Sequence, residues 1–205
     1  MTPKVKVCGV TDAAFAAAAV QRGVDYLGVI FAGKSPRCVT PAAAQAIAQA
    51  ARAARSVAPP RIVGVFVEQT AREIAILADA VPLDVVQLHG AYAATDVAAL
   101  KAKGLEVWRL YDGADAHADA TLLDGQVGKR RGGTGTLADW SLVAELKREG
   151  RRVVLAGGLS PENIAAAAAT GADILDVNSS LETAPGVKSI ELLDALLGEL
   201  NKERP

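Results

Sequence analysis

The sequence predicts an α/β protein in which residues 1–205 form one (β/α)8 barrel, the TIM-barrel architecture, at nearly its minimal size. Short apolar runs alternate with alanine- and leucine-rich stretches along the chain. The apolar runs are continuous and lack polar alternation, which is typical of parallel strands buried on both faces. The number of strand and helix segments in 205 residues fits a barrel as a single domain.

The elements follow in order along the chain. Eight strands are expected at Val5–Cys8, Tyr26–Phe31, Ile62–Phe66, Val85–Leu88, Val107–Leu110, Ala120–Leu123, Val153–Ala156 and Ile174–Val177. Helices are expected at Ala13–Arg22, Pro41–Ala54, Ala71–Ala80, Ala94–Lys103, Trp140–Glu149, Pro161–Ala169 and Ile190–Leu200. Helix start signals occur at Thr11–Asp12, Thr40–Pro41 and Ser160–Pro161. Glycines suited to end a helix are Gly23, Gly104, Gly150 and Gly171.

The region between strands five and seven fits this pattern least well. Residues Asp112–Asp119 are polar and Gly128–Gly135 is rich in glycine, so no full helix is expected between strands five and six. An open, doubly wound sheet is the alternative architecture. It requires a dinucleotide-binding fingerprint after the first strand, and the turn Cys8–Asp12 has only one glycine. The barrel is therefore favoured.

Composition excludes several classes of function. The net charge of -1 and the 4% of aromatic residues argue against a nucleic-acid-binding surface. No apolar run approaches the ~20 residues of a membrane span, and Met1–Lys6 lacks a signal-peptide core, so a cytoplasmic protein is expected. Cys8 and Cys38 make no disulfide framework, and His89 and His117 have no metal-site spacing. Neither a metal nor a membrane partner is expected.

In barrels of this kind, the chemistry lies at the carboxyl ends of the strands. The sequence places Cys8, Gln87, His89, Asp124 and Asp176 at or near these ends. A thiol there can be a nucleophile or general base, although most free cysteines are small buried hydrophobes. A carboxyl group at the end of an apolar strand can be a general acid, since burial raises its pKa. An N-cap or a salt bridge is the other interpretation of Asp124.

Two loops have the composition of a phosphate site. Gly157 and Gly158 follow strand seven, and Ser179 and Ser180 follow strand eight. These two positions commonly bind phosphate in barrels, and two tight turns are the simpler alternative.

Anion binding and cavity closure also have candidate residues. Arg37, next to a proline, can grip a carboxylate with two hydrogen bonds or can be a solvated surface residue. The glycine-rich Gly133, Thr134 and Gly135 are candidates for a lid, with Gln87, His89 and Asp176 as supporting residues.

Taken in order, these segments resemble the phosphoribosylanthranilate isomerase family of tryptophan biosynthesis. The resemblance covers essentially the whole chain. Its segments are Lys6–Thr11, Lys34–Arg37, Val63–Val67, Asp84–Gly90, Leu122–Asp124, Gly132–Gly135, Leu155–Leu159 and Pro185–Lys188. It implies an isomerase that converts N-(5-phosphoribosyl)anthranilate to 1-(2-carboxyphenylamino)-1-deoxyribulose 5-phosphate by an Amadori rearrangement. It implies no metal and no cofactor, and it leaves monomer and homodimer open.

The resemblance also implies roles for particular residues. Cys8 is expected to be the general base, Asp124 the general acid and Arg37 the ligand of the anthranilate carboxylate. The loops with Gly157, Gly158, Ser179 and Ser180 are expected to hold the phosphate.

The chain departs from the family pattern after strand eight. It has Asn178 where the family usually has serine and Ser180 where it usually has glycine. A catalytically impaired or altered-specificity phosphate-binding barrel is therefore the alternative function. A second rival, an isomerase of histidine biosynthesis, typically has an aspartate where this chain has Cys8.

Overall fold

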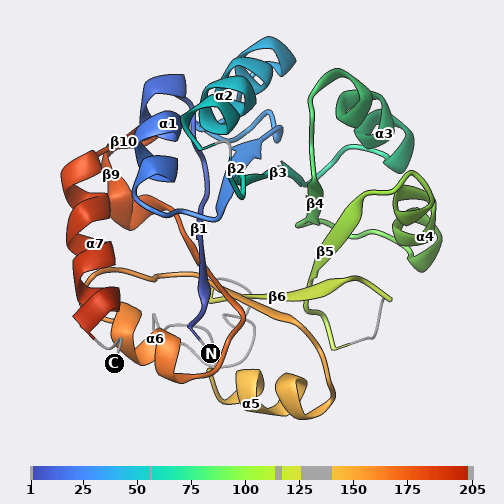
Figure 1. The fold of residues 1–205 in the computed structure, drawn as a ribbon. Coiled ribbons are helices and arrows are strands. Elements are labelled where there is room, and N and C mark those ends of the chain that lie inside the picture. Colours follow the sequence, from blue (N-terminus) through green and yellow to red (C-terminus); the bar gives the residue numbers. More distant parts are fainter. Residues whose placement is uncertain (1, 56, 114–116, 126–139, 203–205) are drawn as a thin grey trace.

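The computed structural model describes residues 2–55, 57–113, 117–125 and 140–202. Eight parallel strands form a closed barrel in which each strand pairs with the next and β8 pairs with β1 (Figure 1). The strands are β1 (Lys4–Val7), β2 (Tyr26–Ile30), β3 (Arg61–Phe66), β4 (Val85–Leu88), β5 (Glu106–Leu110), β6 (Ala120–Asp124), β7 (Val153–Ala156) and β8 (Ile174–Val177). The predicted fold class is confirmed.

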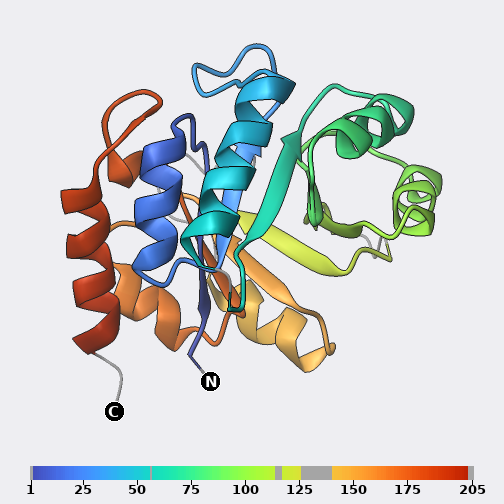
Figure 2. The same cartoon turned by 45° about the horizontal axis from the view of Figure 1, so that its top comes forward.

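Helices surround the barrel, and α1, α2 and α7 lie side by side on its outside (Figure 2). The helices are α1 (Ala13–Gln21), α2 (Pro41–Ala54), α3 (Ala71–Ala80), α4 (Ala94–Ala102), α5 (Ser141–Arg148), α6 (Ile164–Ala169) and α7 (Ile190–Lys202). Side chains of Asp12 and Thr40 cap α1 and α2 at the predicted start signals. In the described part of the chain, none of these helices has the length and apolar character to cross a membrane.

The core has two main layers. The larger apolar cluster lies between the strands and the helices, and a second cluster fills the inside of the barrel around Tyr26, Trp108 and Leu122. A third, smaller cluster contains Cys8, Ile30, Ala32 and Val65. Because Cys8 directly follows β1, this third cluster lies at the carboxyl end of the barrel. The thiol therefore has an apolar layer on one side of it.

Three parts of the chain differ from a regular alternation of strand and helix. Between β5 and β6, the described residues 111–113 and 117–119 contain no helix, as predicted. Helix α6 begins three residues later than predicted, because the Asn163 side chain accepts from Ser160 N and donates to Gly158 O, which holds residues 160–163 in a turn. After β8, a short 3-10 helix (Ser179–Leu181) and the hairpin β9 (Glu182–Ala184) and β10 (Val187–Lys188) were not predicted.

Candidate active site

A cavity of about 520 Å³ lies at the carboxyl ends of the strands. It brings together most of the predicted site residues, although they come from distant parts of the chain. Its walls include Cys8, Arg37, Gln87, His89, Asp124, Gly157, Gly158, Asp176 and Ser179. The cavity also includes Asn178 but not Ser180. Gly133, Thr134 and Gly135 lie outside the described residues.

Cys8 is held at the floor of this cavity. Its backbone N–H donates to Val177 O at 2.8 Å, and the residue is only 6% exposed. Burial raises the pKa of the thiol above its usual 9.0, and the nearby Lys6 ammonium opposes that rise. The thiol is therefore the resting form near neutral pH, and cationic neighbours favour its ionisation.

A buried ion pair lies beside Cys8. Lys6 on β1 is 0% exposed, and its Nζ lies 2.6 Å from Oδ2 of Asp176 on β8. Although burial disfavours the ammonium, the Asp176 carboxylate keeps the pKa of Lys6 above 10.5. Asp176 was expected as a supporting residue, whereas Lys6 was not expected to have a role. The sequence feature that could have revealed Lys6 is a lysine in an apolar strand, two residues before the cysteine.

Gln87 on β4, His89 and Asp124 form a row of interacting side chains. His89 Nε2 is 3.1 Å from Asp124 Oδ2, and Gln87 Nε2 is 3.4 Å from His89 Nδ1. With the Gln87 amide donating to Nδ1, the neutral imidazole carries its proton on Nε2 and donates it to Asp124. The imidazole therefore fixes the orientation of the carboxyl group inside the cavity.

Arg37 reaches the cavity from the loop between β2 and α2. One edge of its guanidinium group forms an ion pair with Glu182. Its Nε and Nη2 donate to the two carboxylate oxygens of Glu182 at 2.8 and 2.6 Å. Lys188 Nζ donates to the same carboxylate at 2.8 Å. Burial opposes ionisation of Glu182, but these hydrogen bonds lower its pKa from 4.5 to about 2. The Nη1 side of the guanidinium donates to none of the described residues and remains for a ligand.

The loop after β7 brings bare backbone to the cavity wall. Gly157 and Gly158 both adopt positive φ, 85° and 72°, a region that favours glycine. A Cβ on Gly157 would lie 2.6 Å from Asp124 Oδ1 and 2.2 Å from Gly125 N. Glycine at 157 is therefore required by the approach of the Asp124 carboxylate as well as by the backbone conformation.

Ser180, which was expected to help hold the phosphate, does not line the cavity. Ser179 lines the cavity, but Ser180 Oγ donates to Leu159 O at 2.6 Å and ties this loop to the loop after β7. Ser180 lies in the 3-10 helix and is absent from the residues with positive φ. Serine in place of glycine therefore does not strain this backbone, and its hydroxyl proton is already donated.

Asn178 lines the cavity and also accepts hydrogen bonds from Lys188. Lys188 Nζ donates to the backbone carbonyl of Asn178 at 2.9 Å and to its Oδ1 at 2.8 Å. Neither Glu182 nor Lys188 was expected to have a role of its own, although Glu182 ends the loop expected to hold the phosphate and Lys188 lies in a segment that carries the family resemblance. Both follow the eighth strand in the unpredicted hairpin, where no strong periodic pattern marks them.

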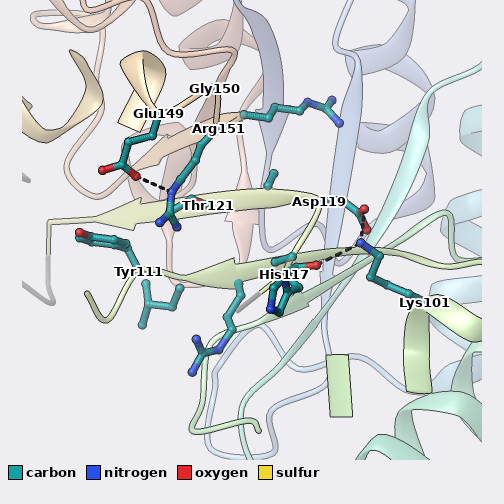
Figure 3. A pocket seen from close by; sticks show the side chains of 13 residues that line it. Lys101, Tyr111, His117, Asp119, Thr121, Glu149, Gly150 and Arg151 are labelled. Atoms are coloured by element: carbon teal, nitrogen blue, oxygen red, sulfur yellow. Dashed lines mark hydrogen bonds and ion pairs between the residues drawn. The ribbon is translucent and has the colours of Figure 1, made fainter. Parts of the chain in front are cut away.

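A second cavity of about 550 Å³ lies outside the barrel beside β5 and β6 (Figure 3). It occupies the side of the barrel where the described residues between these strands form no helix. Lys101 pairs with Asp119 at 2.7 Å and Arg151 with Glu149 at 2.8 Å across its walls. It contains none of the predicted site residues, and its two carboxylates are engaged in these ion pairs.

Comparison with known proteins assigns the chain to a family. The family model described as N-(5'-phosphoribosyl)anthranilate (PRA) isomerase matches residues 5–199. The N-(5'-phosphoribosyl)anthranilate isomerase of Paracoccus denitrificans is 41% identical over 208 residues, covering 92% of each chain. The Vibrio parahaemolyticus TrpCF protein is 40% identical over 200 residues. The match covers 93% of this chain but only 39% of that protein, so the chain spans about two fifths of its length.

Solved structures give the same result. The phosphoribosyl anthranilate isomerase of Thermus thermophilus superposes with a TM-score of 0.85 at 36% identity, covering 98% of this chain and 100% of that one. A phosphoribosyl anthranilate isomerase in complex with reduced 1-(o-carboxyphenylamino)-1-deoxyribulose 5-phosphate has a TM-score of 0.80 at 27% identity, with 98% and 99% covered. By its sequence and its fold, this chain belongs to the N-(5'-phosphoribosyl)anthranilate isomerase family.

Proposed function

We propose that this chain catalyses the Amadori rearrangement of N-(5'-phosphoribosyl)anthranilate, a step of tryptophan biosynthesis. The observation that carries the proposal is the placement of a thiol and a carboxyl group, Cys8 and Asp124, in one cavity at the carboxyl ends of the strands. Cys8 directly follows β1 and Asp124 ends β6, and these strands are not neighbours in the barrel. The two groups can therefore act on different atoms of one bound sugar. We treat residues 1–205 as a single catalytic domain.

Asp124 and Cys8 take the acid and base roles. Protonated Asp124 gives its proton to the furanose ring oxygen, and the bond between that oxygen and C1′ breaks to leave an iminium ion. This cation acidifies the proton on C2′. The Cys8 thiolate takes that proton, and the electron pair of the C–H bond forms the C1′=C2′ bond of an enolamine. Loss of the enol proton and protonation at C1′ then give the ketone. Each positioned proton-transfer group contributes about 10²–10⁴-fold to the rate.

Candidate anchors for the two anionic groups of the substrate line the same cavity as Cys8 and Asp124. The free Nη1 side of Arg37 suits the anthranilate carboxylate, while its other edge is fixed by Glu182. The loops with Gly157, Gly158 and Ser179 suit the phosphate, since bare backbone reaches the cavity there. Holding both anions places the reacting carbons between them, which supplies much of the catalytic effect of orientation.

Two buried oxygen atoms support a substrate rich in hydroxyl groups. Oδ1 of Asp176 and Oε1 of Gln87 are buried at residues that line the cavity and accept no hydrogen bond within the described structure. An unpaired buried acceptor costs about 1–3 kcal/mol, so a donor from the ligand is strongly favoured there. The ribose hydroxyls are such donors. We assign these two acceptors to the sugar.

The experiment follows the fluorescence of N-(5'-phosphoribosyl)anthranilate made in situ from anthranilate and phosphoribosyl pyrophosphate. We expect consumption in proportion to enzyme, with most turnover lost in Cys8→Ala and Asp124→Asn. Cys38→Ser is the matched control, because Cys38 is the exposed thiol and does not line the cavity. Folded wild-type protein that consumes no substrate would instead support the impaired-barrel alternative. Unchanged turnover in Cys8→Ala would remove that residue from the mechanism.

A further inference from the structure

Lys6 is a charged residue inside a barrel whose interior is otherwise largely apolar. Its side chain has 0% exposure, while the cluster around Tyr26, Trp108 and Leu122 fills the barrel on one side of it. Taking a lysine and an aspartate out of water costs more than packing two apolar side chains of similar volume. The Lys6–Asp176 pair is therefore poorly explained by stability alone. Its neighbours give a better explanation.

Cys8 is the neighbour that matters. Cys8 directly follows β1, and its N–H continues the pairing with β8 by donating to Val177 O. Side chains two residues apart on extended chain point to the same face, so Lys6 and Cys8 both face the inside of the barrel. A Cβ on Gly28 would lie 3.0 Å from Cys8 Sγ and 3.3 Å from Lys6 Cε. Glycine on β2 thus leaves the space in which the lysine passes beneath the thiol. The Lys6 ammonium donates to Asp176 Oδ2 at 2.6 Å, and its positive charge lowers the pKa of the neighbouring Cys8 thiol.

We propose that Lys6 is a positioning residue for proton abstraction: its ammonium, held by Asp176, stabilises the Cys8 thiolate and fixes the sulfur at the floor of the cavity. This inference rests on the proposed function, in which Cys8 is the base. In the step itself, the thiolate takes the C2′ proton and becomes a thiol, while Lys6 keeps its own protons. Asp176 matters because a buried lysine without a counter-charge would lose its proton.

Four charged groups act on Cys8 from the surrounding elements. Lys6 on β1 and Lys188 on β10 favour the thiolate, and Arg37 in the loop after β2 also interacts with it. Asp176 on β8 opposes it. Of the two cations that lower the pKa of the thiol, Lys6 has the larger effect. Replacing Lys6 with a neutral residue leaves Asp176 close to the sulfur, so thiolate formation becomes harder.

The test measures the thiol directly in a Cys38→Ser background, in which Cys8 is the only cysteine. The rate of iodoacetamide alkylation is followed against pH, with and without Lys6→Met. A rise of one pKa unit lowers the thiolate fraction about tenfold at a fixed pH below the midpoint. The more basic thiolate regains roughly threefold in nucleophilicity. We therefore expect the alkylation rate of Lys6→Met at about pH 8 to be at least ~3-fold lower. The pH midpoints of alkylation and of kcat/KM should both move to higher pH.

Two further variants separate positioning from folding. Lys6→Met with Asp176→Asn removes both charges and supplies the measurement if the single variant does not fold. We expect a smaller upward shift from it, because the opposing charge has gone as well. Arg152→Met is the matched control: it removes an ion pair with Glu106 (2.6 Å), the first residue of β5, at the opposite end of the barrel from Cys8, and should leave the midpoint unchanged.

A folded Lys6 variant with an unchanged midpoint overturns the inference, as does a uniform loss of kcat/KM at every pH. Alkylation needs no substrate. A shifted thiol midpoint in a protein without isomerase activity would therefore overturn the proposed function and leave the role of Lys6 toward Cys8 intact.

Discussion

Gly157 lies so close to the Asp124 carboxylate that a methyl group at 157 would come within 2.6 Å of Asp124 Oδ1. The same methyl group would meet the backbone of Gly125 at 2.2 Å, where nothing flexible can yield. The glycine expected to serve phosphate binding therefore also sets the position of the candidate acid. One residue links the anion loop to the proton donor.

We predict that Gly157→Ala displaces Asp124 and lowers kcat by about 10²-fold or more, the contribution expected of a positioned acid. Gly171→Ala is the matched control, since Gly171 has nearly the same φ (84° against 85°) and nothing within 4 Å of the new Cβ. Both variants should lose about 1–2 kcal/mol of unfolding free energy from the left-handed conformation. Gly157→Ala should lose more than this, because its methyl group also meets the Gly125 backbone. Steady-state kinetics and urea unfolding check this. Equal kcat in the two variants would refute the role of the close approach.

The pH dependence of the reaction follows from the burial of Cys8. In the proposed mechanism the thiolate is the active form, and burial raises the pKa of the thiol above 9.0. The active fraction is therefore small at neutral pH and grows as pH rises. We predict that kcat/KM increases with pH from about 7 to about 9.

The measurement is a pH profile of kcat/KM under conditions where the fold is shown to be intact at each pH. Cys38→Ser should reproduce the wild-type profile, because its thiol is exposed and outside the cavity. A profile that is flat across this range would assign the base to a different group.

Ser180 tests the impaired-barrel alternative. Its backbone does not need glycine, and its hydroxyl ties the loop after β8 to Leu159 O. We predict that Ser180→Gly does not raise kcat/KM. It should lower the unfolding free energy by about 1–2 kcal/mol, through the lost hydrogen bond and the greater freedom of glycine in the unfolded chain. Ser180→Ala isolates the hydroxyl. Increased turnover in the glycine variant would show that the serine impairs this enzyme.

Much of the fold was predictable because its signals are local. Strands β4, β7 and β8 have their predicted bounds, since parallel strands buried on both faces leave continuous apolar runs in the sequence. The predicted C-terminal glycines, such as Gly23 and Gly104, adopt positive φ at helix ends. The predicted start of α6 was wrong because Ser160 and Pro161 form part of a turn stabilised by Asn163. A capping pattern does not distinguish a helix from a turn that precedes one.

The candidate site was predictable only residue by residue. The rule that strand ends carry the chemistry placed Cys8, His89 and Asp124 correctly in one cavity. Lys6 has a local signal, because it is a lysine in an apolar strand, but nothing local shows which residue each of these charged groups pairs with. Lys6 and Asp176 are 170 residues apart, and Arg37 and Glu182 are 145 apart. They meet because the barrel closes β1 against β8 and because the hairpin after β8 folds back over the loop after β2.

The hairpin carboxylate Glu182 gives the last prediction. The folded state lowers its pKa from 4.5 to about 2. Between these values the unfolded chain binds more protons, so the stability from Glu182 is fully present above about pH 4.5 and is lost as pH falls to about 2. We predict that Glu182→Gln loses about 1.5–3 kcal/mol at neutral pH, the usual contribution of hydrogen bonds to charged groups. It should also lose less stability than the wild type over this acid range.

Chemical unfolding at several pH values measures this difference, and Glu149→Gln is its control. Glu149 also pairs with an arginine, but its side chain is 47% exposed against 4% for Glu182, so we expect its replacement to change little. Glu182→Gln should also raise KM more than it lowers kcat, because Arg37, which lines the cavity, loses the ion-pair partner that fixes its guanidinium. An unchanged KM together with the predicted loss of stability would make Glu182 a structural residue only. Parallel pH curves for wild type and Glu182→Gln would mean that this carboxylate does not gain its stability from Arg37 and Lys188.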